Sequence, residues 1–145
     1  NGVPNNLVPF VAQTAAGIHK KIKVFGNDYN TPDGTCIRDY INVMDLAYAH
    51  VTAVDRLLNK DLQEPEVYNL GTGKGLSVME LIKTFEAVNG VKVPYEIVGR
   101  REGDIEQVWA NPSLAQKVLK WKAKASVEET LASAWKWQQR CMERK

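Results

Sequence analysis

Residues 77–98, SVMELIKTFEAVNGVKVPYEIV, decide the fold class, because they predict one complete helix followed by one strand. Ser77 and Glu80 have the spacing of a capping box, in which a helix start satisfies its own backbone donors. The Asn-Gly pair at 89–90 is typical of a helix end. The run VPYEIV at 93–98 is then predicted as a strand. Helix and strand therefore alternate in this stretch of the chain.

The elements expected before this stretch are a helix from Asn5 or Asn6 to Gly17 with Pro9 in its first turn, a strand in KIKVFG (21–26), a loop at NDYNTPDGT (27–35), a strand in RDYINV (38–43) and a helix over 46–59 capped by Asp45. The others are a strand in EVYNLGTG (66–73), a short helix in NPSLAQKVL (111–119) with Asn111 as cap and Pro112 at its first position, and a last helix at 126–141 with a capping box at Ser126 and Glu129. This alternation predicts an α/β class. Because the strands are few and scattered, a small α+β-like domain is expected over residues 1–145.

Composition excludes several classes of function. The chain has 145 residues, 44% hydrophobic and 25% charged, which is enough for one soluble domain with its own core. A net charge of +2 without a basic run argues against a nucleic-acid partner. No apolar stretch is long enough for a membrane span, and the first ten residues lack the features of a secretory signal.

The two cysteines and the first residue bear on location and completeness. Cys36 and Cys141 have neither the spacing of a metal site nor that of a disulfide framework, so we expect free thiols in a reducing cytoplasm. The chain begins NGVPNNLVP without an initiator Met. We therefore expect it to be a piece of a longer polypeptide.

Two motifs leave alternatives open. NLGTGKG at 69–75 follows a predicted strand, but its G-x-G-x-G spacing is not that of a phosphate-binding loop, so a tight strand-to-helix turn is the favoured interpretation. Arg38, Asp39 and Tyr40 follow the predicted loop. Either Arg38 and Asp39 form a local pair that stabilises the loop, or Arg38 binds a phosphate through its forked guanidinium.

The stretch VGRREGD at 98–104 can bind an anion through Arg100 or Arg101 and hydrogen-bond a hydroxyl through its acids. No complete catalytic set accompanies it. His19 and His50 have no partner at a recognised catalytic or metal-binding spacing, and no Tyr-x-x-x-Lys occurs in the 145 residues. We expect both histidines to be structural and no metal to be bound, and we do not expect the chain to be an enzyme by itself.

Five runs together resemble the UDP-glucose 4-epimerase family of the extended short-chain dehydrogenase/reductases: PNNLVPFVAQ, VFGNDYNTPDGTCIRDYINVMDLAYAH, YNLGTGKGLSV, RREGD and WANPSLAQKVLKW. They cover nearly the whole chain in the family's order. The resemblance implies the C-terminal, substrate-binding portion of an NAD-binding Rossmann-fold enzyme, without the Rossmann half that holds NAD and the catalytic tyrosine. Segments near 40–75 would belong to the Rossmann sheet of that longer protein, and its dimer would form through the absent half.

The resemblance also implies roles for ten residues, all in substrate binding. Asn6 and Leu7 would contact the diphosphate and uracil regions, and Lys23, Val24 and Phe25 would line the uracil pocket. Arg38 and Arg101 would hold the diphosphate, Asp104 the ribose, and Tyr40 would support the pocket. Val108 stands where some members have a bulky tyrosine, which leaves space beside the sugar. Arg100 and Glu102 are expected to be solvated neighbours.

In that family the reaction passes hydride from sugar C4 to NAD and returns it to the other face, with UDP-glucose and UDP-galactose as the pair. The smaller Val108 implies that the N-acetylhexosamine pair is accepted as well. Asn42 stands where the family often has a histidine, and we expect this difference to be tolerated. Two alternatives remain: a portion of a sugar-nucleotide dehydratase or decarboxylase of the same superfamily, and a non-catalytic nucleotide-sugar-binding module.

Overall fold

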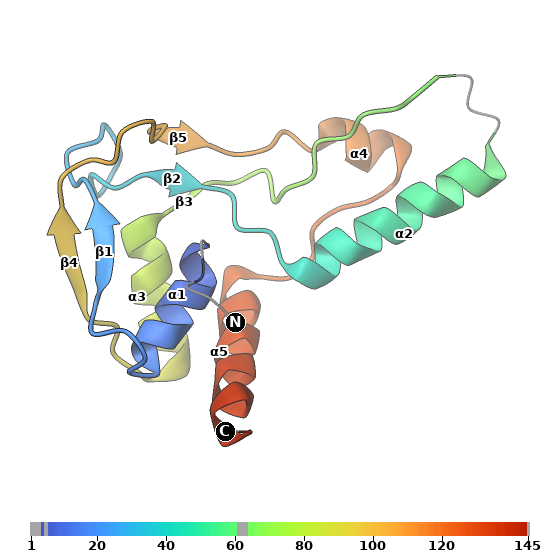
Figure 1. Cartoon of the computed structure of the whole chain (residues 1–145). Helices are drawn as coiled ribbons and strands as arrows, with labels where there is room; N and C mark the ends of the chain where they lie inside the picture. Colours follow the sequence, from blue (N-terminus) through green and yellow to red (C-terminus); the bar gives the residue numbers. More distant parts are fainter. Residues whose placement is uncertain (1–3, 5, 61–63, 145) are drawn as a thin grey trace. The chain divides into compact units, whose positions relative to one another are not determined.

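The computed structural model describes residue 4, residues 6–60 and residues 64–144 (Figure 1). The chain divides into two units. The first unit comprises Asn1–Ile37, Ser77–Glu106 and Ser126–Lys145, and the second comprises Arg38–Leu76 and Gln107–Ala125. Helices and strands alternate along the chain as predicted, which confirms the α/β class.

Three helices of the first unit begin where their capping residues predict. They are α1 (Leu7–Ala15), α3 (Val78–Asn89) and α5 (Val127–Glu143). Ser77 and Ser126 each complete a capping box, and α3 ends at Gly90 in the left-handed conformation. Asn6 is the N-cap of α1, while its alternative Asn5 lies outside the described residues. The four side chains of these two capping boxes are local to their helices, which is why the sequence was sufficient to find them.

The strands of the first unit form a parallel pair, β1 (Ile22–Phe25) and β4 (Tyr95–Val98). In their register Ile22 lies opposite Tyr95 and Phe25 opposite Val98. Helix α1 contacts β1, and α5 packs against both α1 and α3 (Figure 1). The buried side chains that hold these elements together include Val11, Val24, Leu81, Ile82, Phe85 and Leu131. This packing holds β1 and β4 in place, and it so fixes the edge of the unit at which both strands end.

The two tryptophans of α5 lie in different environments, as their spacing of two residues predicts. Trp135 packs edge-on against the buried ring of Phe85, with 5.9 Å between the ring centroids. Trp137 is two positions further along the helix and is 62% exposed. Residues two apart cannot share one helix face, so only one of the pair reaches the core.

The second unit is built on α2 (Val43–Asn59) and α4 (Ser113–Val118). Its core contains Ala49, Ala115, Leu119 and Trp121, all nearly inaccessible to solvent. The indole N–H of Trp121 donates to the backbone oxygen of Asp45 at 3.0 Å, which satisfies the one polar atom of this buried ring.

Three two-residue strands form the second sheet: β2 (Ile37–Arg38), β3 (Leu76–Ser77) and β5 (Gln107–Val108), in the order β3-β2-β5. The division between the units falls inside β2 and inside β3. Because β2 ends at Arg38, the predicted strand over 38–43 is wrong for all but its first residue.

The start of α2 explains that error. Asn42 is the N-cap of α2, and its side chain accepts from the backbone N–H of Met44 at 2.8 Å. The predicted cap Asp45 is instead in the first turn of the helix. Its carboxylate accepts from the N–H groups of Lys124 and Ala125 at 3.0 and 2.9 Å. Asp45 therefore binds backbone groups 79 and 80 positions away, and it does not cap the helix as its local sequence predicted.

Two other predicted elements differ from the structure. Residues 66–73 contain no strand, and the chain enters β3 only at Leu76. Helix α4 begins at Ser113 rather than at Pro112, although Asn111 does accept from the N–H of Ser113 at 3.1 Å. The helix start thus differs by one residue, whereas the predicted strand at 66–73 is wrong.

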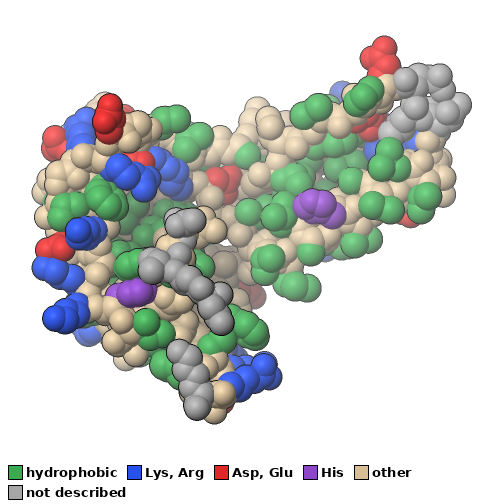
Figure 2. Space-filling model, viewed as in Figure 1, with side chains coloured by type: hydrophobic (Ala, Val, Ile, Leu, Met, Phe, Trp, Pro, Cys, Tyr) green, Lys and Arg blue, Asp and Glu red, His purple; other side chains and the backbone are tan. Residues whose placement is uncertain are grey.

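Helix α2 carries many exposed apolar side chains. Met44, Val51, Val54 and Leu58 are 53–79% exposed, and Tyr48 is exposed as well. Hydrophobic side chains gather along this helix in Figure 2. The spacing of positions 44, 48, 51 and 58 places these residues on neighbouring turns of one side of the helix.

Candidate functional site

The loops that follow β1 and β4 lie side by side. Because the two strands are parallel and Phe25 lies opposite Val98, the segments that follow β1 and β4 leave the sheet at the same edge. The N–H of Gly26 continues the pairing by donating to the oxygen of Val98 at 2.9 Å. In α/β proteins, ligands bind beyond the carboxyl ends of parallel strands. This edge of the first unit is therefore the candidate site.

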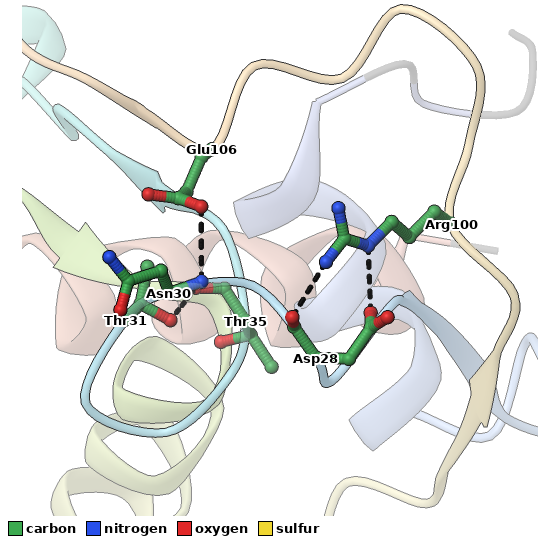
Figure 3. Close-up of polar contacts among 6 residues, drawn as sticks. All are labelled: Asp28, Asn30, Thr31, Thr35, Arg100 and Glu106. Atoms are coloured by element: carbon green, nitrogen blue, oxygen red, sulfur yellow. Dashed lines mark hydrogen bonds and ion pairs between the residues drawn. The ribbon is translucent and has the colours of Figure 1, made fainter.

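Arg100 joins the two loops. Its Nε donates to Asp28 Oδ1 at 2.8 Å and its Nη2 donates to the backbone oxygen of Asp28 at 2.6 Å (Figure 3). The guanidinium also lies 4.1 Å above the centroid of the buried Tyr29 ring. The hydrogen bond from Arg100 lowers the pKa of Asp28, and burial raises the pKa of the Tyr29 phenol. Arg100 is half-exposed, in agreement with its prediction as a solvated neighbour, but its contacts with Asp28 were not predicted.

Arg101, the next residue, is also exposed to solvent. Its side chain is 64% exposed, and its Nη2 lies 2.7 Å from Oδ1 of Asp104, whose side chain is only 10% exposed. Its guanidinium also lies 5.3 Å from the centroid of the Phe25 ring. The hydrogen bond to Asp104 raises the pKa of Arg101. Arg101 and Asp104 therefore come together in one short turn, with the cation outward.

A second contact fastens the far end of that turn. The N–H of Asn30 donates to Glu106 Oε2 at 3.0 Å, and the N–H of Ile37 donates to the backbone oxygen of Glu106 at 2.9 Å. Within the loop after β1, the hydroxyl of Thr31 donates to the oxygen of Thr35 at 2.8 Å (Figure 3). The loop is thus closed on itself and joined to the segment that carries Arg101.

Asp33 secures the same loop to the start of α3. Its carboxylate accepts from the N–H and hydroxyl of Thr35 at 2.9 and 2.7 Å, and from the hydroxyl of Ser77. Burial alone would raise the pKa of Asp33, but the hydrogen bonds from Ser77 and Thr35 outweigh burial and lower it. The loop therefore has fixed geometry although it contains no helix or strand.

The other predicted residues of the first unit occupy different environments. Phe25 and Lys23 alternate outward along β1, whereas the side chain of Val24 is 1% exposed and belongs to the core. Val24 can reach a ligand only through its backbone. Asn6 is exposed at the N-terminus of α1, and Leu7 is the first residue of that helix.

Arg38, Tyr40 and Val108 belong to the second unit. Arg38 and Tyr40 are half-buried, and Val108 is 46% exposed. Asp39 has a structural role: its carboxylate accepts from the N–H and hydroxyl of Thr72 and from the N–H of Ala110. It joins the segment after β2 to two others in its unit.

The Gly-rich turn at 69–75 is used internally. The backbone N–H of Thr72 lies 3.1 Å from both oxygens of Asp39, so an internal carboxylate occupies the donor that a phosphate would need. At Gly71 a Cβ would lie 2.3 Å from Asp39 Oδ2 and 2.6 Å from the Cβ of Ala110, so only glycine fits. The turn does not fit a dinucleotide.

The histidines and cysteines have structural surroundings. His19 stacks on Phe10 with 4.3 Å between ring centroids and hydrogen-bonds Gln13, and His50 hydrogen-bonds the oxygen of Leu46. Cys36 and Cys141 are free thiols. Over residues 6–60 and 64–144, no group of three or more metal-ligating side chains is clustered. None of the described helices is long and apolar enough to cross a membrane.

Comparison with known proteins identifies the family. The family model described as GDP-mannose 4,6 dehydratase matches residues 1–134. The chain belongs to this family. Within it, the chain is 51% identical over 138 residues to the UDP-glucose 4-epimerase of Bacillus subtilis, which confirms the resemblance to the epimerases. The match covers 95% of this chain and 40% of that protein, so the chain spans about two fifths of the length of this relative.

Solved structures of epimerases have the same fold. The UDP-glucose 4-epimerase of Stenotrophomonas maltophila, with bound NAD and formylated UDP-arabinopyranose, matches with a TM-score of 0.95 and 46% identity, over 100% of this chain and 43% of that one. The enzyme from Bifidobacterium longum, in complex with NAD+ and UDP, matches with a TM-score of 0.90 and 47% identity, over 97% of this chain and 41% of that one.

Sequence reasoning missed three residues that shape the site, Asp28, Asp33 and Glu106, and it missed the contact of Arg100 with Asp28. Arg100 and Asp28 are 72 positions apart, and Glu106 and Asn30 are 76 positions apart. The parallel pairing of β1 with β4 brings these segments to one edge, and the N–H of Ile37 joins them again through the oxygen of Glu106. A prediction of the β1–β4 pairing from the two strand patterns is a signal that could have found the contact of Arg100 with Asp28.

Proposed function

We propose that the chain is the C-terminal, substrate-binding portion of an NAD-dependent UDP-glucose 4-epimerase, an isomerase of galactose metabolism that interconverts UDP-glucose and UDP-galactose. The observation that carries the proposal is the turn from Arg101 to Asp104 at the carboxyl edge of β1 and β4. It presents an exposed guanidinium beside a nearly buried carboxylate. A guanidinium suits a diphosphate and a carboxylate suits a sugar hydroxyl, and a nucleotide sugar contains both groups.

The other proposed substrate contacts rest on the resemblance to the epimerase family. Arg101 binds the diphosphate together with Arg38, and Asp104 accepts from the ribose. Phe25 offers its exposed face to the uracil, with Lys23 and the backbone of Val24 beside it, and Tyr40 supports the pocket. Asn6 and Leu7 stand at the N-terminus of α1, where backbone N–H groups favour an anion.

NAD and the catalytic tyrosine belong, in this proposal, to the rest of a longer cytoplasmic protein that dimerises outside this chain. Two observations support a larger sheet that takes in residues near 40–75. The extended residues from Pro65 to Leu70 carry no strand pairing among the described residues, and α2 exposes its apolar side chains. The lengths of the relatives agree with such a partner segment.

Calorimetric titration of the full-length gene product with UDP tests the site. Arg101→Gln removes a charge-assisted contact, and the affinity for UDP is expected to fall roughly tenfold or more. Arg140→Gln, which removes an exposed cation from α5 of the same unit, is the matched control and should leave the affinity unchanged. Equal affinities of the wild type and Arg101→Gln would contradict the assignment. Conversion of UDP-galactose to UDP-glucose by the same protein tests the reaction.

The side chain at position 108 is proposed to set the breadth of the sugar specificity. Val108 is small and partly exposed, so the proposal includes the N-acetylhexosamine pair as substrates. Val108→Tyr should lower the activity on UDP-N-acetylglucosamine far more than that on UDP-glucose. An unchanged ratio of the two activities would show that this position does not select the sugar.

A second candidate is a sugar-nucleotide dehydratase, which the description of the matching family favours. The two reactions differ in their products, because a dehydratase removes water from the sugar and an epimerase keeps its mass. Mass spectrometry of the sugar product therefore separates them. A loss of one water from the product would favour the dehydratase.

A further inference from the structure

The turn that carries Arg101 and Asp104 is fastened at both of its ends to one neighbouring loop. At the first end Arg100 donates to the side chain and the backbone of Asp28 (Figure 3). At the second end Glu106 accepts from the N–H of Asn30 at 3.0 Å. Residues 101–104 lie between these two contacts, so both ends of the turn are positioned by the loop that follows β1.

The packing around Arg100 makes the first contact specific. The guanidinium is placed by two hydrogen bonds and lies 4.1 Å from the Tyr29 centroid. Gly26 makes room for this arrangement, since a Cβ there would lie 2.6 Å from Tyr29 Cε2 and 3.0 Å from Arg100 Cγ. Arg100 therefore contacts Asp28 and Tyr29, whereas the neighbouring Arg101 contacts Phe25 and Asp104.

Such contacts contribute little to global stability. The side chains of Arg100 and Asp28 are 50% and 67% exposed, and ion pairs at exposed positions add little to the free energy of folding because water screens them. Their effect falls on local order instead. A turn that is already held in place has less conformational freedom to lose when a ligand binds.

We propose that Arg100, with Asp28, and Glu106, with Asn30, are positioning residues that hold the turn 101–104 in its ligand-binding geometry. This inference rests on the proposed function, because it assigns the arginine next to Arg101 a role in presenting Arg101 to a diphosphate. Arg100 itself contacts the loop and not the ligand. Of the two neighbouring arginines, Arg100 thus positions the turn and Arg101 binds the ligand.

The test measures UDP affinity by calorimetry on the full-length gene product. Arg100→Met keeps an unbranched apolar side chain close to the length of the aliphatic part of arginine and removes the donors, and it is expected to weaken UDP binding roughly three- to tenfold. Glu106→Ala should act in the same direction. Glu106→Gln, which keeps an acceptor oxygen for Asn30, should restore most of the affinity. Lys92→Gln breaks an exposed ion pair with Glu86 elsewhere in the unit and serves as the control, with no change expected.

A second background separates positioning from general destabilisation. If Arg100 acts through Arg101, Arg100→Met should have little further effect on UDP affinity in an Arg101→Gln protein. An equal loss in both backgrounds, or no loss in either, would overturn the inference while leaving the proposed function intact. Failure of the wild-type protein to bind UDP would overturn both. The thermal midpoint, measured on the same samples, is expected to change little between wild type and Arg100→Met.

Discussion

Replacing Asp39 by alanine is expected to lower the free energy of unfolding of the second unit by about 3 kcal/mol. The carboxylate accepts from the hydroxyl of Thr72 at 2.7 Å, from the N–H of Thr72 at 3.1 Å and from the N–H of Ala110 at 3.2 Å. Alanine leaves all three donors without this acceptor. These residues are partly shielded from water, so the solvent replaces the lost bonds only in part.

The magnitude follows from the number and kind of bonds. A hydrogen bond to a charged group contributes about 1.5–3 kcal/mol, and contributions of donors that share one carboxylate overlap. Two of the three donors belong to Thr72, which reduces the sum to about 3 kcal/mol. Asp39→Asn should cost less, about 1–2 kcal/mol, because its amide oxygen can still accept from Thr72 while its NH2 group faces the N–H of Ala110.

Urea denaturation combined with native-state hydrogen exchange measures this loss. Trp121 lies in the core of the second unit and reports its unfolding by fluorescence, and the amides of Thr72 and Ala110 report local opening. Asp55→Ala, which removes an exposed carboxylate from the same unit, is the control and should stay within about 0.5 kcal/mol. A change below about 0.5 kcal/mol for Asp39→Ala as well would refute the structural role assigned to this carboxylate.

Two further outcomes are expected. Gly26→Ala places a Cβ at a φ of +77° and 2.6 Å from the Tyr29 ring, so thermal denaturation should show a loss of about 1–3 kcal/mol, whereas Gly99→Ala, whose Cβ meets no atom within 4 Å, should be nearly neutral. Glu66 has its pKa lowered from 4.5 to about 2, chiefly by the hydrogen bond from Arg56, so its stabilising contribution is complete above about pH 4.5 and is lost as the pH falls toward 2. The difference in urea midpoint between the wild type and Glu66→Gln should shrink over that window, and a difference that does not depend on pH would contradict the assignment.

Helices that carry their own boundary signals were predictable. Ser77 with Glu80, and Ser126 with Glu129, satisfy the first backbone donors of α3 and α5 within four residues, so each signal is complete in the local sequence. Strands have no such local completeness, because their hydrogen bonds go to another segment. Residues 66–73 have the pattern of a strand, and they remain outside any sheet of the described chain.

The candidate site was predictable only in part for the same reason. The composition of the Arg-Arg-Glu-Gly-Asp run predicts an anion site, and the family resemblance assigns the anion to Arg101 rather than to Arg100. The work that Arg100 does depends on Asp28, a residue 72 positions earlier that no local pattern selects. Asp39 shows the converse: its sequence neighbours suggested a pair with Arg38, while the structure gives it Thr72 and Ala110 as partners.

The division into units limits how the gene can be dissected. The first unit consists of three separate segments and the second of two, so the chain passes between the units at four places. Removing residues inward from Asn1 or from Lys145 shortens the first unit before it reaches the second, which lies in the interior of the sequence. An independent second unit requires an internal deletion of 77–106, with a designed linker that joins Leu76 to Gln107. Its own two ends would then lie at Arg38 and Ala125.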